Sequence, residues 1–373
     1  MRDHLRQLFH AGIGACLPRT VLPPCLPAEA PRVVLAIGKA AGAMARVAEA
    51  HYPGVGGLAV VPHGWDADLR RIELLQAGHP VPDEASVTAA ERLLTLAGDG
   101  GALVLLSGGA SALACLPGAG LTLADKQAIT ATLLRSGAPI DEINCVRRHL
   151  SRIKGGRLPA SLTLAISDVV GSAPETIGSG PTVADPTTVA DARAILDRYG
   201  LDAPLTETAK QMPGDFRLIA SAADLLADAA AEAERLGYTP VLLGECTGEA
   251  REVGRAHAEA ARALPSGSAL ISGGELTVTV TGSGKGGPNL EYALGAAALL
   301  ADRPDIHGLA ADSDGIDGNS GAAGAFFSGA DAAGFGALAA NDSAAWFAAS
   351  GGLFAPGPTG TNVNDLRIIL VGR

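Results

Sequence analysis

Short apolar segments that end in glycine-rich or acidic polar loops constrain the fold of this chain most. Val33–Ile37 leads into Gly38-Lys39, Ala102–Leu106 leads into Ser107-Gly-Gly-Ala-Ser111, and Thr163–Ile166 leads into Ser167-Asp168. Such runs, set between helical stretches, indicate strands that are buried on both faces. Ligands bind at the carboxyl ends of the strands in open α/β sheets. The pattern therefore predicts a mostly parallel sheet with a ligand site along one edge.

The alternation of strands and helices continues through the chain. Further strands are expected at residues 58–61, 72–76, 216–220, 240–243, 269–271, 307–311 and 366–371. Helices are expected at residues 40–50, 83–96, 123–136, 140–150, 189–199, 221–236, 248–264, 289–301 and 343–350. Residues 276–281 are rich in β-branched side chains and alternate in polarity, which favours an antiparallel strand in a mixed sheet.

Two domains are expected, because 373 residues exceed what one hydrophobic core usually supports. The strand and helix pattern loosens between Leu201 and Pro213. We therefore predict an N-terminal α/β domain at residues 1–205 with a mostly parallel, doubly wound sheet. Residues 206–373 are predicted to form a mixed α/β domain.

The composition excludes several classes of protein. A net charge of −11 and a pI near 5.2 argue against a surface for polyanions, although a small phosphorylated ligand needs only a local basic cluster. The five cysteines are scattered without a C-x-x-C pair, which indicates neither a disulfide framework nor a zinc site. The N-terminus resembles an amphipathic helix, and glycines and Asp331 interrupt the most apolar later stretch. A soluble, cytoplasmic protein is expected.

The loop at residues 107–111 is suited to an anion. Gly108, Gly109 and Ala110 can turn backbone N–H groups toward a bound oxyanion, and Ser107 and Ser111 add hydroxyl donors. A plain strand-to-helix turn has a similar composition. The position at the end of a predicted strand favours a cradle for phosphate or carboxylate.

Basic residues are concentrated in one segment of this acidic chain: Arg147, Arg148, His149, Arg152, Lys154 and Arg157. Such a run usually forms a solvated helix face, and we expect this for Arg148 and Arg152. Two glycines follow Lys154, however, and the segment leads into the strand before Asp168, an arrangement that suits phosphoryl transfer. Lys39 lies in a similar corner between a strand and a helix.

Two carboxylate positions are candidates for metal or proton chemistry. Asp168 follows a predicted strand, where it can hold Mg²⁺, accept a proton or cap an ordinary turn. Asp312, Asp314 and Asp317 follow another strand, and they suit either a hard cation or a capped turn. No glutamate stands at the distance that an EF-hand requires.

Residues 282–287 match G-x-G-x-x-G literally, but this is weak support for a dinucleotide site. The preceding segment is expected to be antiparallel, and no acidic residue lies convincingly on a following parallel strand. The chain contains no Walker A sequence, so P-loop proteins are not supported.

Taken together, these segments resemble the class II glycerate kinases, the glycerate 2-kinase family with a C-terminal MOFRL-type domain. The matching segments are 36–40, 78–84, 106–112, 148–157, 167–168, 178–182, 272–275, 284–287, 314–318 and 357–365. The resemblance implies two α/β domains with the active site in the cleft between them. It also implies phosphorylation of the 2-hydroxyl of D-glycerate by ATP with Mg²⁺ or Mn²⁺.

Motif by motif, the resemblance also implies roles for individual residues. The catalytic candidates are Lys39, Lys154, Asp168 and Asp314. The candidates for binding substrate or phosphate are Ser107, Gly108, Gly109, Ala110, Ser111, Arg147, Glu275, Lys285 and Asn289. The candidate metal ligands are Asp168, Asp312 and Asp314. Which carboxylate acts as base and which binds the metal stays open.

Two departures from the family pattern leave the substrate open. Pro288 stands where the family usually has an arginine, and Asn319-Ser320-Gly321 replaces the usual Pro-Thr-Asp. The alternatives are a hydroxypyruvate reductase using a nicotinamide cofactor and a non-catalytic sensor of hydroxy acids. The partners expected are a nucleotide and a small hydroxy acid, without nucleic acid or membrane. The oligomeric state is open, a homodimer included.

Overall fold

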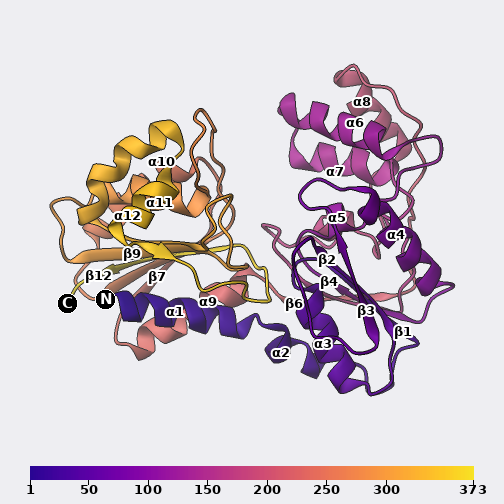
Figure 1. The fold of residues 1–373 in the computed structure, drawn as a ribbon, viewed down its shortest axis with the longest axis horizontal. Helices are drawn as coiled ribbons and strands as arrows, with labels where there is room; N and C mark the ends of the chain where they lie inside the picture. The colour runs from indigo at the N-terminus through magenta and orange to yellow at the C-terminus, as the bar shows by residue number, and fades with distance from the viewer. The chain divides into compact units, whose positions relative to one another are not determined.

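The computed structural model describes residues 1–373, which divide into two compact units (Figure 1). One unit comprises Pro18–Ile219, and the other combines Met1–Leu17 with Ala220–Arg373. The division therefore differs from the predicted boundary at residue 205, and the N-terminal segment belongs with the C-terminal half. None of the helices combines the length and apolar composition needed to cross a lipid bilayer.

The N-terminal helix α1 (Arg2–Ala15) explains part of this difference. Its buried face packs against α9 (Ala222–Arg235), and the ring of Phe9 lies edge-on to that of Phe354 with centroids 4.9 Å apart. The amphipathic sequence predicts that one face is buried, but the element that covers it lies more than 200 residues away. Only the folded chain brings the two together.

The unit Pro18–Ile219 is built on a six-stranded sheet in the order β3-β2-β1-β4-β5-β6. The pairs from β3 to β5 are all parallel, which confirms the predicted doubly wound arrangement. Its strands are β1 (Val33–Ile37), β2 (Gly57–Pro62), β3 (Ile72–Ala77), β4 (Ala102–Leu106), β5 (Leu162–Ile166) and β6 (Asp215–Ala220).

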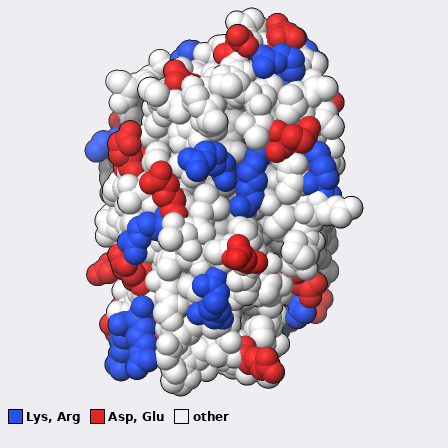
Figure 2. All heavy atoms as spheres, turned by 90° about the vertical axis from the view of Figure 1, so that its right-hand side faces the viewer, with Lys and Arg blue, Asp and Glu red and all other residues white.

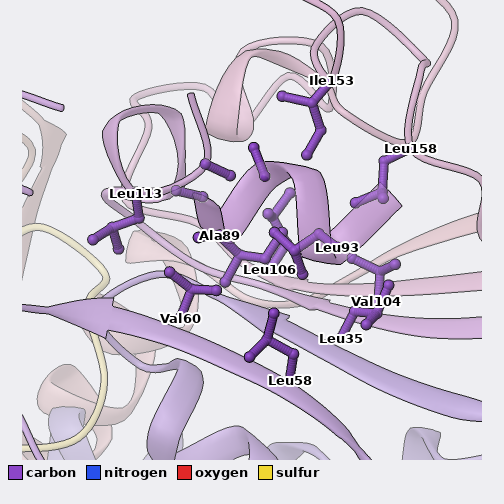
Figure 3. Close-up of a cluster of buried hydrophobic side chains, with 14 of the residues drawn as sticks. Leu35, Leu58, Val60, Ala89, Leu93, Val104, Leu106, Leu113, Ile153 and Leu158 are labelled. Atoms are coloured by element: carbon purple, nitrogen blue, oxygen red, sulfur yellow. The ribbon is translucent and has the colours of Figure 1, made fainter. Parts of the chain in front are cut away.

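Helices cover both faces of this sheet. On one face α4 (Glu84–Ala97) packs against alternate residues of the central strands, and Figure 3 shows Leu93 above Leu35 and Val104. The N-cap of this helix is Asp83, whose carboxylate accepts the backbone N–H of Ser86. On the other face α3 (Ala41–His51) contacts the same strands.

A second cluster of helices in this unit has its own apolar core. It is formed by α6 (Leu123–Arg135), α7 (Ile140–His149) and α8 (Val189–Arg198). Short helical segments complete the unit: α2 (Pro18–Val21), η1 (Pro23–Cys25), α5 (Ala110–Leu113) and η2 (Ile177–Ser179).

The other unit contains a mixed sheet in the order β11-β10-β9-β12-β8-β7, in which only β7 and β8 are parallel. Its strands are β7 (Thr239–Glu245), β8 (Ser268–Gly273), β9 (Ile306–Asp312), β10 (Gly324–Ser328), β11 (Leu353–Phe354) and β12 (Asp365–Val371). Figure 1 shows α1 and α9 on one face. The other face carries α10 (Ala250–Ala263), α11 (Pro288–Ala297), α12 (Ser343–Ser350) and the 3₁₀ segment η3 (Gly329–Ala340).

The predicted strand at residues 276–281 is wrong. This segment makes a single isolated bridge, between Thr277 and Glu249, and is otherwise a loop. Its β-branched side chains favour a strand, but β7 and β12 already pair with the two edges of β8, the strand that precedes it. The strands β10 and β11, which the sequence analysis did not predict, occupy the far edge instead.

Candidate functional site

The carboxyl ends of β1 and β4 form the natural ligand position in the unit Pro18–Ile219. These two strands are neighbours, yet β2 and β3 lie beyond β1 whereas β5 and β6 lie beyond β4. The chain therefore leaves β1 and β4 in opposite directions, and doubly wound sheets bind their ligands at such a point. The loops there are those that begin at Gly38 and Ser107.

Two predicted site segments are locked together at this point. The N–H of Lys39 donates to the carbonyl of Gly108 at 2.8 Å, and the N–H of Ala40 donates to Ser107 Oγ at 3.0 Å. Gly38 has a φ of +131°, and a Cβ there would lie 2.2 Å from Ser107 Oγ. Ser107 is fully buried, so its hydroxyl braces the two loops.

Gly109 brings two further side chains to the same place. It has a φ of +82°, and a Cβ there would lie 3.0 Å from the ring of His79 and 3.5 Å from Lys39 Cγ. The stem of Lys39 therefore runs alongside the loop 107–111. His79 was part of a family motif in the sequence but was not proposed as a site residue.

Lys154 is held against the end of the same loop. Its Nζ donates to the carbonyl oxygens of Ser111 at 2.6 Å and Ala114 at 3.1 Å. The hydroxyl of Ser111 lies 3.0 Å from that of Ser179, and the N–H of Gly155 donates to the carbonyl of Ser179. The structure thus joins three segments that are distant in the sequence.

A cavity of about 470 Å³ opens beside this loop, and Gly109, Ser111, Arg147 and Lys154 are among its lining residues. A second buried lysine, Lys126, also lines this cavity and was not predicted as a site residue. Its Nζ donates to the carbonyls of Leu150 at 3.2 Å and Arg147 at 3.4 Å. A signal was present: Lys126, Ile129 and Leu133 repeat at helical spacing on the buried face of α6.

The electrostatics of this cavity are those of an anion site. Burial lowers the pKa of Lys126 to about 8 and that of Lys154 to about 7, where the charge of Lys126 contributes further. Burial also lowers the pKa of Arg147. No carboxylate is among the groups that shift these three pKa values. Figure 2 shows one face of the molecule, on which basic and acidic side chains are interspersed.

The other basic residues of the segment serve the fold. Arg148 was expected on a solvated face, but it is buried and forms an ion pair with Asp185, with 3.0 Å between Nε and Oδ2. This contact is too poorly aligned to count as a hydrogen bond. Arg157 donates to four backbone carbonyls, and Arg152 is exposed as predicted.

Asp168 lies two residues after the end of β5, at the same edge of the sheet, and is half-buried. It does not line the cavity of Lys126 and Lys154. Its position after the strand matches the prediction, and its proposed part in metal binding or proton transfer stays a prediction.

In the other unit, predicted carboxylates lie at the end of β9. Asp312 Oδ1 accepts the N–H of Asp314 at 2.8 Å, and Asp314 Oδ1 accepts the N–H of Ile316 at 2.8 Å. Asp314 is buried and Asp312 half-buried. Nowhere in the structure are three or more His, Cys, Asp or Glu side chains grouped to hold a metal ion.

Asn289 and two further carboxylates form a buried cluster at the start of α11. The Asp317 carboxylate accepts the N–H groups of Asn289 at 3.1 Å and Leu290 at 3.0 Å, while Asn289 Nδ2 donates to Asp365 at 2.6 Å. Burial and the nearby Asp365 raise the pKa of Asp317 to about 7. Asn289 is 1% exposed, so it ties the helix start to this cluster rather than facing an open pocket.

The remaining predicted residues of this unit are exposed. Glu275 follows β8, and Lys285 lies in the glycine loop before α11, where its N–H donates to Asp342 Oδ1 at 3.1 Å. Pro288 is the first residue of α11, a position where the missing N–H of proline costs little. The loop 282–287 follows no strand, so it lacks the context of a dinucleotide fingerprint.

Two protein-family models match the chain. One is described as a domain of unknown function, DUF4147, and matches residues 4–212. The other is described as the MOFRL family and matches residues 268–365.

Several proteins are similar over most of their length. A protein of Agrobacterium vitis named "Putative hydroxypyruvate reductase" is 43% identical, covering all of this chain and 94% of the relative. The glycerate 2-kinase of Pyrococcus horikoshii is 38% identical over 91% of this chain and 87% of its own length. The D-glycerate 2-kinase of Thermotoga maritima is also 38% identical, over 91% of this chain and 90% of its own length.

A crystal structure of glycerate kinase from Thermotoga maritima matches with a TM-score of 0.90 and 36% identity over 99% of both chains. The order of the two matched domains and the similarity along nearly the whole chain agree with the motifs in the sequence. The chain therefore belongs to the glycerate 2-kinase family, with a DUF4147 domain followed by a MOFRL domain.

Proposed function

We propose that this protein is a glycerate 2-kinase that transfers the γ-phosphoryl group of ATP to the 2-hydroxyl of D-glycerate. The observation that carries the proposal is the cavity beside the loop 107–111, in which Lys126, Arg147 and Lys154 meet without a carboxylate. Phosphoryl transfer depends chiefly on positioning and on stabilising charge that spreads over several oxygens. Buried, uncompensated cations at the switch point of the sheet are suited to that task. The names of the two glycerate 2-kinases support the choice of substrate.

Each unit contributes candidates for the chemistry. In the unit Pro18–Ile219, Lys39 and Lys154 would neutralise charge on the transferred group, and Asp168 would orient or deprotonate the acceptor hydroxyl. In the other unit, Asp314 is the alternative base, while Glu275 and Lys285 remain candidates for binding substrate. Asn289 keeps a supporting role through its bonds to Asp317 and Asp365.

Magnesium is the proposed metal. The carboxylates of Asp168, Asp312 and Asp314 provide the hard oxygen donors that Mg²⁺ and Mn²⁺ prefer. The lack of any group of three ligating side chains fits Mg²⁺, which proteins usually hold through one or two carboxylates together with substrate phosphates. A metal held by these carboxylates would neutralise charge on the phosphate groups. We expect activity to disappear after exhaustive EDTA treatment and to return with Mg²⁺ or Mn²⁺; full activity without metal would contradict this.

Hydroxypyruvate reduction is the rival activity, suggested by the name of the Agrobacterium vitis protein. The structure argues against a nicotinamide site in either unit. The turn after β1 reads Gly38-Lys39-Ala40-Ala41-Gly42, without the dinucleotide fingerprint, and β2 ends at Pro62-His63 instead of the acidic residue that binds a ribose. The loop 282–287 does not follow a strand.

One assay separates these activities. Purified protein is incubated with D-glycerate and Mg·ATP, and the product is identified by ³¹P NMR, which distinguishes 2-phosphoglycerate from 3-phosphoglycerate. A parallel reaction with hydroxypyruvate and NADH or NADPH is followed by absorbance. We expect 2-phosphoglycerate and ADP, without nicotinamide oxidation. Nicotinamide oxidation alone would favour the reductase, and no reaction in either arm would favour a sensor. Light scattering tests whether a homodimer forms.

A further inference from the structure

The cavity beside the loop 107–111 has two chemically different parts. Its inner part carries the cations Lys126, Arg147 and Lys154. Its outer part is apolar and is formed by residues 80–82 and by Ala131 and Leu134 of α6. Gln127 Nε2 donates to the carbonyl of Pro82 at 2.7 Å and so holds the two apolar walls together.

The two lysines are oriented by backbone carbonyls. Lys154 uses two of its three N–H donors on the carbonyls of Ser111 and Ala114, and Lys126 uses two on those of Leu150 and Arg147. A carbonyl fixes an ammonium group without cancelling its charge. Each lysine therefore retains a donor for a ligand, at almost no cost in side-chain ordering when the ligand binds. An anionic ligand beside the two ammonium groups would favour their charged forms.

The number of charges indicates a polyanion. Two buried lysines and the half-buried Arg147 line one cavity, and Lys126 and Arg147 both lower the pKa of Lys154. A hydroxy-acid carboxylate brings a single negative charge, whereas a nucleoside di- or triphosphate brings several. The charge of a polyphosphate matches the site better.

The size of the cavity and its apolar wall also favour a nucleotide. A volume of about 470 Å³ lies within the range of roughly 300–1,000 Å³ for pockets that hold ligands of drug size. A three-carbon hydroxy acid would leave most of it empty. Val81 and Leu134 are 63% and 55% exposed although both are large and apolar, so a flat base placed on them would remove apolar surface from water.

We propose that this cavity binds the nucleotide rather than the hydroxy acid, with the polyphosphate on Lys126, Arg147 and Lys154 and the base against the apolar wall. The inference rests on the proposed kinase function. It assigns the nucleotide, one of the two substrates of that reaction, to this cavity. It also gives Lys126, which no motif identified, a role in binding nucleotide.

The test is isothermal titration calorimetry of the full chain with four separate probes. These are a non-hydrolysable ATP analogue, tripolyphosphate, adenosine and D-glycerate, each in the presence of Mg²⁺. Lys126→Met removes the charge but retains most of the side-chain length. Arg135→Met is the matched control, because Arg135 lies exposed on the same helix and outside the cavity. Circular dichroism checks that each variant is folded, and Arg147→Met replaces Lys126→Met if the latter does not fold.

We expect Lys126→Met to weaken the binding of the ATP analogue and of tripolyphosphate about 10- to 100-fold, as expected for the loss of one charged hydrogen bond. The affinity for D-glycerate should change by no more than about threefold, as expected for an independent site. Ala131→Trp should fill the apolar part, so that adenosine and the ATP analogue bind more weakly while tripolyphosphate does not.

The assignment is overturned if Lys126→Met weakens the binding of D-glycerate and leaves the binding of the nucleotide unaffected, because the cavity would then hold the hydroxy acid. It is equally overturned if Lys126→Met behaves like Arg135→Met toward every probe. A protein that binds nucleotide as predicted but does not phosphorylate D-glycerate would refute the proposed substrate and leave the nucleotide site intact.

Discussion

Replacing Lys154 by methionine should make the protein more stable at pH 6 and less stable at pH 10. Lys154 is almost fully buried, and burial together with the charge of Lys126 lowers its pKa from 10.5 to about 7. One pKa unit corresponds to about 1.4 kcal/mol, so below pH 7 the charged ammonium costs the folded state about 5 kcal/mol. The lost bonds to the carbonyls of Ser111 and Ala114 offset about 2–3 kcal/mol of that gain. The net stabilisation at pH 6 is therefore about 2 kcal/mol.

The pH dependence distinguishes this cause from any change in packing. Between pH 7 and 10.5 the unfolded chain binds more protons at Lys154 than the folded chain does, so wild-type stability rises with pH there by about 1.4 kcal/mol per unit. Methionine does not titrate. The advantage of the variant should thus shrink at this rate, vanish near roughly pH 8.5 and become a deficit of about 2 kcal/mol at pH 10.

The assay is urea unfolding followed by circular dichroism at pH 6, 7.5, 9 and 10, with the free energy of unfolding of the variant compared with that of the wild type. Arg152→Met is the control, because Arg152 is exposed in the same segment and should show no comparable dependence on pH. A difference that stays constant with pH, or a variant that is less stable at pH 6, would refute the reasoning. Phosphoryl transfer should be lost at every pH, since the ammonium is part of the proposed site.

Three further predictions follow from the loops and from the glycine segment before α11. Lys39→Ala should lower kcat about 100- to 1,000-fold with an unchanged melting temperature, as for one group that stabilises developing charge; near-normal turnover would remove Lys39 from the site. Gly38→Ala should lower the free energy of unfolding in urea by about 3 kcal/mol, because Gly38 has a φ of +131° and a Cβ there would meet Ser107 Oγ. Gly64 has open space around it, so Gly64→Ala should cost about 1 kcal/mol. Equal losses would contradict the steric argument. Pro288→Arg should raise kcat/KM for D-glycerate and Lys285→Ala should raise its KM, since a guanidinium or ammonium there can hold the substrate anion; if Pro288→Arg is neutral or harmful, other residues already provide that contact.

Local sequence was sufficient where the structure depends on neighbouring residues. The strands Val33–Ile37 and Ala102–Leu106 were predicted with the bounds that they have, because an uninterrupted apolar run that leads into a glycine-rich loop has few alternatives. The loop 107–111 and Lys39 were placed at one edge of the sheet for the same reason. The helix predicted at residues 83–96 is observed as α4 at Glu84–Ala97.

Prediction failed where distant parts of the chain compete for the same position. Residues 276–281 have the composition of a strand, but both edges of β8 are taken by β7 and β12. The amphipathic helix α1 was recognised, but its covering partner α9 was not, and the structure groups Met1–Leu17 with Ala220–Arg373. Arg148 resembled a solvated residue until Asp185 was folded next to it.

The same division runs through the candidate site. Most of the strands and the glycine loops could be predicted from the sequence, because hydrophobic periodicity and turn residues act over a few neighbouring positions. The motifs in those loops were also sufficient to indicate the family and the type of chemistry. Only the tertiary structure decided that Lys126 and Lys154 share one cavity and that Asn289 is tied to Asp317 and Asp365. The pKa values of the two lysines and of Asp317 depend on burial and on charged groups that are distant in the sequence, such as Asp365 for Asp317. Long-range packing sets those surroundings, and no local pattern encodes it.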